Sequence, residues 1–267
     1  MLKELIRRST YQLVDVATRR RGITRHINGQ PIRLAPEVAR YYLATYEPST
    51  HAFIARHTAP GTLAIDAGAH IGLFTVLMAR AVGPHGRVLS FEPTATTAGL
   101  LRRTVELNGL DGVVDCRREA VSSSRGFAEF FVDEHDASNA NSLVRTIGAV
   151  ASVRVPTVSI DDLVSEQPQP ASCIKIDVEG AELAVLRGAT ATLSRDRPAL
   201  ALDVHPAQLA AAGGSVAEIW DLLEGRGYAL MTADERLDRT ATVERSEIFE
   251  LHAVAANRSA TRGARRS

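Results

Sequence analysis

Short apolar runs alternate with helix-length segments from residue 62 onward, and this alternation restricts the fold more than any other feature. The runs that are typical of buried strands are residues 62–65, 88–91, 173–176 and 199–204. The segments with helical length and periodicity are about 72–82, 95–108, 181–193 and 215–226. This order predicts an α/β fold with a mostly parallel sheet and helices on both faces. Such sheets bind ligands beyond the carboxyl ends of their strands.

The chain divides into three predicted parts. Residues 1–60 are predicted to form an N-terminal helical extension, because apolar residues recur at helical spacing ahead of the arginines at 19–21. We expect this helix to dock on the body; binding to an anionic membrane surface is the alternative. Residues 61–257 form the main domain, in which 127–132 is typical of one hairpin arm. Residues 258–267 form a basic tail that we expect to be disordered.

The net charge of zero conceals an uneven distribution. Residues 1–40 carry nine Lys or Arg against three Asp or Glu, and residues 258–267 carry four Arg and no acid. The remaining residues, 41–257, therefore hold 18 basic and 28 acidic side chains, a net charge of −10. An acidic body argues against nucleic acid as a partner, because phosphate neutralisation needs a basic surface.

Cysteine content and hydropathy indicate the compartment. Cys116 and Cys173 are far apart and lack a C-x-x-C spacing, which argues against a disulfide framework or a zinc cluster. Charges occupy the first eight residues, where a signal peptide needs an apolar core, and no run approaches the ~20 apolar residues of a membrane span. We expect a cytoplasmic protein without stable membrane insertion.

The segment 63–75 combines an apolar strand, a turn of small residues and the start of a helix. Gly68 allows close backbone approach to a ligand, and Gly72 lets the helix begin near the strand. The dinucleotide fingerprint G-x-G-x-x-G fails here, because Asp66 and Ile71 occupy its first and third glycine positions. The sequence therefore disfavours a nicotinamide oxidoreductase.

Two acidic residues follow successive predicted strands. Asp66 suits a cationic, hydroxyl-rich ligand such as S-adenosylmethionine, whose amino-acid and sulfonium portion it would contact directly or through water. Glu92, in the sequence Phe-Glu-Pro that includes Pro93, can accept hydrogen bonds from both ribose hydroxyls. A helix-capping Asp66 with a surface Glu92 is the alternative. The pair predicts S-adenosylmethionine as the cofactor.

Three motifs together resemble the FkbM family of S-adenosylmethionine-dependent methyltransferases. They are IDAGAHIGLFT at 65–75, FEP at 91–93 and IKIDVEGAELAVLRG at 174–188, and the similarity spans about residues 45–232. The resemblance implies that 61–257 is a class I methyltransferase domain. Its Rossmann-like sheet would have seven strands, the seventh inserted antiparallel beside the sixth. It further implies O-methylation of a hydroxyl on a sugar, glycan, polyketide or related small molecule.

The same comparison completes the expected cofactor site. His70 stands where the family usually has Asn, and the segment 119–122 resembles the adenine-side segment of the family. The polar stretch 136–143 resembles a loop that the family uses near the cofactor; an ordinary solvent loop is the alternative. The predicted cofactor-binding residues are Asp66, Gly68, His70, Gly72, Glu92, Pro93, Ala120, Asp177 and Glu179.

Asp177 and His205 are the predicted catalytic residues. An alcohol acceptor must lose a proton, and His205 follows a strand that should lie beside the one ending at Asp177. His70 and His135 are the second and third choices of base. Asp177 with Glu179 holding a divalent ion is the alternative, although no dense ligand constellation leads us to predict a metal site.

Two further charged residues lie near Asp177. Glu182 is expected to stabilise the first turn of the helix that follows, rather than to bind a ligand. Lys175 is unusual in a strand covered on both faces, so we expect it to pair with a neighbouring carboxylate; a solvated sheet edge is the alternative.

The acceptor and the oligomeric state leave no signature in the sequence. Residues 1–60 and 133–155 depart most from the cofactor core, so we expect them to recognise the acceptor. A nitrogen, carbon or macromolecular acceptor is one alternative. A methyltransferase-like fold that only binds a ligand or a partner is another, because a fold does not determine a function.

Overall fold

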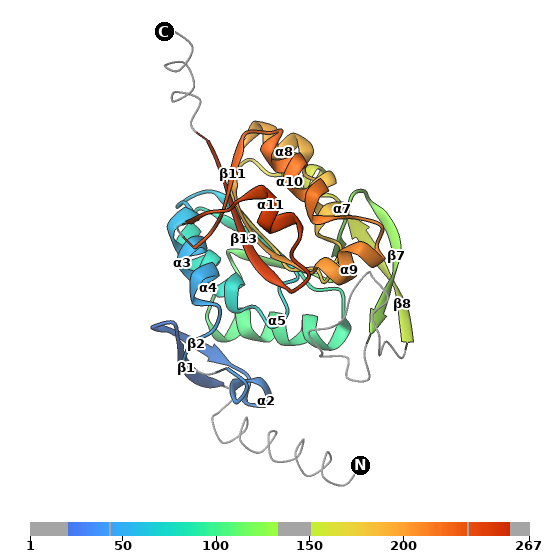
Figure 1. The fold of residues 1–267 in the computed structure, drawn as a ribbon. Helices are drawn as coiled ribbons and strands as arrows, with labels where there is room; N and C mark the ends of the chain where they lie inside the picture. The colour runs from blue at the N-terminus through green and yellow to red at the C-terminus, as the bar shows by residue number, and fades with distance from the viewer. Residues whose placement is uncertain (1–20, 43, 133–150, 234, 257–267) are drawn as a thin grey trace, which may run out of the picture.

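The computed structural model describes residues 21–42, 44–132, 151–233 and 235–256, and its centre is one large sheet (Figure 1). The order of the eight strands across this sheet is β12-β11-β13-β10-β9-β3-β4-β5. Their bounds are Leu63–Ala67 (β3), Arg87–Phe91 (β4), Val114–Arg117 (β5), Ala171–Ile176 (β9), Ala199–Val204 (β10), Tyr228–Thr232 (β11), Glu235–Arg236 (β12) and Phe249–Ala255 (β13).

The strand directions are those of a class I methyltransferase sheet. Strands β3, β4, β5, β9 and β10 are parallel to one another, whereas β13 pairs antiparallel with both β10 and β11. The predicted Rossmann-like α/β class is confirmed, including the late strand inserted antiparallel. The two-residue strand β12 adds an eighth member at the edge, where seven strands were predicted.

Helices cover both faces of the sheet. Side chains of successive strand residues point to opposite faces, and because those of the central strands are buried on both, each face needs a layer of helices. On one face, Ala64, Val88 and Cys173 pack in a core with α3 (Pro48–His57), α4 (Leu73–Val82) and α5 (Ala95–Leu107). The other face packs against five helices or helical turns. These are α6 (Ile160–Ser165), α7 (Glu182–Arg187), α8 (Thr190–Arg195), α9 (Pro206–Ala211) and α10 (Val216–Glu224). A further short helix, α11 (Arg239–Val243), contacts α10.

The helix predicted over 181–193 is divided into α7 and α8 at Gly188 and Ala189. A Cβ at Gly188 would lie 2.3 Å from the carbonyl oxygen of Ser122, so the chain passes too close for a side chain there. The carbonyl of Gly188 accepts a hydrogen bond from the amide of Asp161 at 2.8 Å. The close contacts of Gly188 with the segments around Ser122 and Asp161 therefore interrupt the helix at this point.

The described part of the N-terminal segment begins with a β-hairpin, which the predicted helical extension did not include. It consists of β1 (Ile23–Ile27) and β2 (Gln30–Leu34), followed by the short α2 (Pro36–Ala39). Its apolar side packs against the first turns of α4 through residues such as Leu34 and Leu73. Residues 1–20, where the helical pattern was read, lie outside the described residues.

A small second sheet flanks the main one. It contains β6 (Ala120–Val121), β7 (Gly126–Val132) and β8 (Ala151–Val158), in the order β6-β8-β7. The antiparallel pairing of β7 with β8 confirms that 127–132 is one arm of a hairpin. His135, the polar stretch 136–143 and the tail 258–267 lie outside the described residues. None of the helices described is both long and apolar enough to cross a bilayer.

Candidate active site

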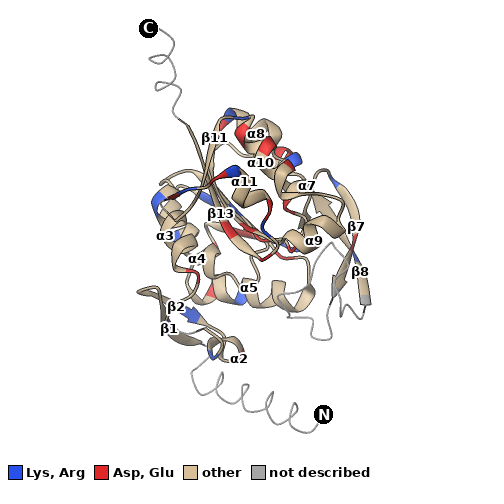
Figure 2. Cartoon of the chain, in the orientation of Figure 1, with Lys and Arg blue, Asp and Glu red and all other residues tan. Residues whose placement is uncertain are grey.

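A cavity of about 380 Å³ opens at the carboxyl ends of β3, β4, β9 and β10. This is the position expected for a ligand in a parallel sheet, and the volume is within the range of small-molecule pockets. In Figure 2 red ribbon segments, which mark acidic residues, gather beside β13, and Phe249 and Glu250 of this strand line the cavity. The predicted site residues that line the cavity are Gly68, His70, Glu92, Pro93, Ala120, Asp177, Glu179 and His205.

Asp66 and Gly72 are not among the lining residues. Asp66 is fully buried below the turn, where its Oδ2 accepts a hydrogen bond from Thr75 Oγ1 at 2.6 Å. Its Oδ1 is also enclosed and has no hydrogen-bond partner among the described residues. Burial raises the pKa of this carboxyl. In this conformation Asp66 can fasten the turn to α4, whereas a direct ligand contact would need the turn to open.

Gly68 lies where the carboxyl ends of β3, β4 and β9 meet. Its φ of 81° is a left-handed conformation, and a Cβ there would lie 1.8 Å from the carbonyl oxygen of Asp177. The amides of Gly68 and Ala69 both donate to the carbonyl of Phe91, at 3.1 and 2.9 Å. The turn after β3 is therefore packed against the ends of β4 and β9, and this contact sets one wall of the cavity.

Helix α4 starts next to this wall. Gly72 precedes its first residue with a φ of 90°, and a Cβ there would lie 2.7 Å from Leu101 Cδ1 of α5. The role predicted from sequence, close packing at the helix start, is thus visible, but Gly72 contacts α5 rather than the cavity.

Glu92 is held in a fixed orientation at the end of β4. Its Oε1 accepts hydrogen bonds from the amide and the hydroxyl of Thr94, at 3.0 and 2.8 Å. Only 7% of the residue is exposed, and the exposed part lines the cavity. A buried, oriented carboxylate at this strand end is suited to accepting hydrogen bonds from a diol.

His70 occupies the same turn with a φ of 48°. His, like Asn, is one of the residues that enter the left-handed region more often than most, so the exchange preserves the backbone shape. Its Nδ1 lies 3.2 Å from the hydroxyl of Tyr42, which follows the hairpin and α2. The N-terminal segment therefore reaches the Gly68 turn that lines the cavity.

Lys175 forms a buried ion pair with Asp177. The Nζ atom is 3.0 Å from Asp177 Oδ2 and 5.1 Å from the ring centroid of Phe74, and 4% of its side chain is exposed. Burial opposes the charged form, but the surrounding carboxylates, led by Asp177 and Asp203, outweigh it and raise the lysine pKa. The predicted pairing of Lys175 with a neighbouring carboxylate is confirmed.

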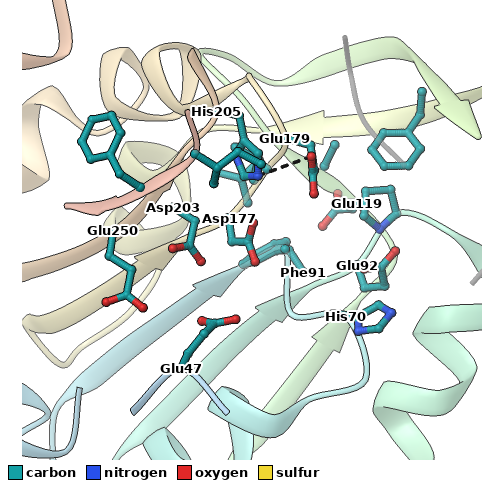
Figure 3. Close-up of a pocket in the computed structure, with 18 of the residues that line it drawn as sticks. Glu47, His70, Phe91, Glu92, Glu119, Asp177, Glu179, Asp203, His205 and Glu250 are labelled. Carbon is teal, nitrogen blue, oxygen red and sulfur yellow. Dashed lines mark ion pairs between the residues drawn. The ribbon is translucent and has the colours of Figure 1, made fainter. Parts of the chain in front are cut away.

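His205 lies between Glu182 and Glu179, and Figure 3 shows its ion pair with Glu179. Its Nδ1 is 2.9 Å from Glu182 Oε1, and its Nε2 is 3.4 Å from Glu179 Oε2. Burial would lower the pKa of His205, but the hydrogen bond to Glu182 and the nearby carboxylates raise it to about 9. Burial also raises the pKa of Glu179, to about 7, against the opposing effect of His205.

This arrangement changes what can be expected of His205. A protonated imidazole at neutral pH offers no lone pair to a hydroxyl proton, so His205 fits a lone general base poorly. Glu182 does stand in the first turn of α7, as expected. It is also fully buried and accepts a hydrogen bond from the amide of Gly180 at 2.9 Å, so it fixes both this turn and the histidine ring.

Three carboxylates of the cavity escaped the sequence reasoning: Glu47, Asp203 and Glu250. The β10–β13 register places Asp203 directly opposite Glu250. Burial, together with the nearby carboxylates, raises the pKa of Asp203 to about 7, although Lys175 opposes the shift, and burial likewise raises the pKa of Glu47. Asp203 had a usable signal, an acid two residues before His205 at a strand end. No pattern in the sequence around Glu47 indicates that it lines the cavity.

Comparison with known proteins is consistent with this geometry. Residues 66–230, more than half of the chain, match the sequence model of the methyltransferase FkbM domain. The chain belongs to the FkbM methyltransferase family. The match confirms the family that the three sequence motifs predicted.

This FkbM methyltransferase is similar in sequence to two curated proteins and in structure to one solved protein. It is 30% identical over 192 residues to Methyltransferase 1 of Beauveria bassiana, across 65% of this chain and 74% of that protein. It is 35% identical over 130 residues to the hexuronic acid methyltransferase AglP of Haloferax volcanii, across 48% and 50% of the two chains. The structure of methyltransferase FkbM from Methylobacillus flagellatus aligns with 15% identity and a TM-score of 0.45, covering 76% of this chain and 50% of that one.

Proposed function

We propose that this FkbM methyltransferase binds S-adenosylmethionine and methylates a hydroxyl group on a sugar, glycan, polyketide or related small molecule. The observation that carries the proposal is the cavity itself. One wall, at the ends of β3 and β4, presents the Gly68 turn and the oriented carboxylate of Glu92, and the neighbouring wall, at the ends of β9 and β10, presents Asp177, Glu179 and His205. The first wall suits a ribose-bearing cofactor, and the second suits an acceptor that must lose a proton.

The residues present fit the cofactor. Glu92 is buried and fixed by Thr94, as a bidentate acceptor for two ribose hydroxyls needs to be. Glu119, Ala120 and Val121 continue the same wall beyond β5, where an adenine ring would meet backbone and apolar groups. When bound, S-adenosylmethionine supplies a methyl group already activated on a sulfonium. The work left for the protein is alignment, exclusion of water and removal of the acceptor proton.

The acceptor side combines acids with aromatic rings. Tyr46 and Phe249 line it together with Glu47, Asp203 and Glu250. Two of these residues come from the segment just after the N-terminal hairpin and its short helix, which agrees with the expectation that residues 1–60 help to recognise the acceptor. The relative AglP is described as acting on a hexuronic acid, which supports a sugar among the possible acceptors.

Calorimetry tests the cofactor directly. We expect S-adenosylmethionine and S-adenosylhomocysteine to bind the full chain with micromolar affinity, because the cavity supplies a diol acceptor and seven carboxylates in its lining. Absence of binding heat with either ligand at high concentration would contradict the proposal. A labelled-methyl screen against sugar, nucleotide-sugar and polyketide acceptors then tests the acceptor, and label found only on nitrogen or carbon would exclude O-methylation.

Replacing Glu92 with alanine should weaken cofactor binding by ~1–3 kcal/mol, the usual effect of losing a hydrogen bond to a charged group. Calorimetry with S-adenosylhomocysteine gives the affinity, and thermal unfolding shows whether the variant is folded. Glu106→Ala, on the exposed face of α5, is the matched control and should bind like the parent protein. Unchanged affinity in Glu92→Ala would remove this residue from the cofactor site.

A further inference from the structure

Asp177, Glu179 and His205 bring ligand atoms together at the ends of β9 and β10. One oxygen or nitrogen of each residue lies within 4.8 Å of those of the other two. We propose that these residues form a site for a divalent cation of the Mn²⁺ or Mg²⁺ type, which receives the acceptor hydroxyl. The inference deepens the proposed function and rests on it only for the role of the ion, not for its binding.

The spacing fits coordination. Carboxylate and imidazole ligands lie about 2.0–2.2 Å from such octahedral ions, so adjacent ligand atoms of one ion are about 2.8–3.1 Å apart. His205 Nε2 and Glu179 Oε2 are 3.4 Å apart. Asp177 enters the same group from the end of β9, and small side-chain rotations would close the remaining distance.

The histidine ring is oriented as in a metal ligand. Glu182 holds Nδ1 at 2.9 Å, which turns Nε2 toward Glu179 and the cavity. Ligating histidines usually donate their second nitrogen to a carboxylate in this way, which fixes the tautomer and the ring, and a bound ion takes the place of the proton on the ligating nitrogen. Glu182 is wholly buried, and its Oε2 has no hydrogen-bond partner among the described residues. This carboxylate, held by the Gly180 amide and the His205 ring through its other oxygen, stands directly behind the cluster.

The surrounding charge also favours a cation. Glu47, Asp203 and Glu250 line the same side of the cavity, as Figure 3 shows, whereas the nearby Lys175 is already paired with Asp177. Two carboxylates with one imidazole suit Mn²⁺ better than a thiolate-preferring metal. Three protein ligands leave coordination positions open toward the cavity. An ion there would lower the pKa of a bound hydroxyl and so assist its deprotonation.

Mn²⁺ binding to the full chain, freed of metal with a chelator and without cofactor, tests the site. Electron paramagnetic resonance measures free Mn²⁺ during a titration. We expect one Mn²⁺ per chain that Mg²⁺ displaces, and at least ~10-fold weaker binding in Glu179→Gln and His205→Ala, since even outer-shell changes at metal sites cost that much. Glu106→Gln, which removes an exposed carboxylate on α5 away from the cavity, is the matched control and should bind Mn²⁺ like the parent.

A second measurement needs no substitution. Bound Mn²⁺ should broaden the NMR signals of the His205 ring in the parent protein before those of His51 or His57 on α3. Failure to bind Mn²⁺, or equal binding in all variants, would overturn the metal site, and intact S-adenosylhomocysteine binding would then leave the proposed function standing. Mn²⁺ binding at these residues in a protein that binds neither cofactor form would support the site and contradict the proposed function.

Discussion

Lys175→Met is expected to lower the free energy of unfolding by about 3–5 kcal/mol, the usual cost of leaving a buried ion pair with one partner. Methionine keeps most of the volume of the side chain but removes its charge. Asp177 then loses its partner at 3.0 Å, and Asp66, Asp203 and Glu47 lose the cation that opposes the rise of their pKa values. Chemical denaturation monitored by circular dichroism measures the change.

The pH dependence of this loss separates charge from packing. Asp203 already has a pKa raised to about 7, far above the ~3.9 of an unfolded aspartate, so the stability linked to its protonated form is lost as the pH rises through 7. Without Lys175 this pKa rises further, so the deficit should stay nearly constant below about pH 6 and grow from about pH 6 to about pH 8, as Asp203 of the parent ionises. A deficit that stays constant over this range would contradict the electrostatic origin.

The exposed pair of Arg187 and Glu218 provides the control for this prediction. Their charged atoms are 2.8 Å apart, but about half of each side chain is exposed to solvent. Arg187→Met should therefore change the stability by less than ~1 kcal/mol. A comparable loss in both variants would show that burial of the lysine is not what makes its pair important.

Gly68→Ala is expected to destabilise the protein by about 2–5 kcal/mol and to abolish cofactor binding. An alanine in the left-handed region costs about 1–2 kcal/mol, and forcing extra volume into a packed site costs about 1–3 kcal/mol. The added Cβ would lie 1.8 Å from the Asp177 carbonyl, so the turn must move away from the end of β9. Denaturation and calorimetry with S-adenosylhomocysteine measure the two effects.

Gly109→Ala isolates the backbone contribution. Gly109 follows α5 with a φ of 68°, and nothing lies within 4 Å of the position that a Cβ would take. It should lose only the ~1–2 kcal/mol of left-handed strain and bind the cofactor normally. If Gly68→Ala bound the cofactor as well as this control, the close approach to Asp177 would not be needed for the site.

The sequence predicted those site residues whose position depends only on the strand that directly precedes them in the chain. Gly68, Glu92 and Asp177 each follow a buried strand, and parallel strands bring their carboxyl ends to one edge. Asp66 was only partly understood, because a strand-end acid can face the ligand or the core. Its burial depends on Thr75, nine residues later in the chain, and no spacing rule indicates this hydrogen bond.

The cavity carboxylates that the sequence did not predict are brought together by strands that are far apart in the chain. Glu250 lies opposite Asp203 only because β13 inserts antiparallel beside β10, and its register is set by the whole strand. The N-terminal hairpin, in contrast, had a readable signal. Asn28 and Gly29 occupy its turn with φ values of 48° and 78°, and Asn-Gly between apolar residues is a strong hairpin indicator.

The position of β13 has a consequence for how the enzyme is made. This strand lies between β10 and β11, although it follows both in the chain. During synthesis the ribosome therefore releases β10 and β11 before the strand that must separate them. Phe249 and Glu250, which line the cavity beside Asp203, belong to this late strand. The ends of β3, β4, β9 and β10 are thus synthesised before the strand that completes the cavity lining, and we expect the nascent chain to form this pocket only after β13 has paired with β10 and β11.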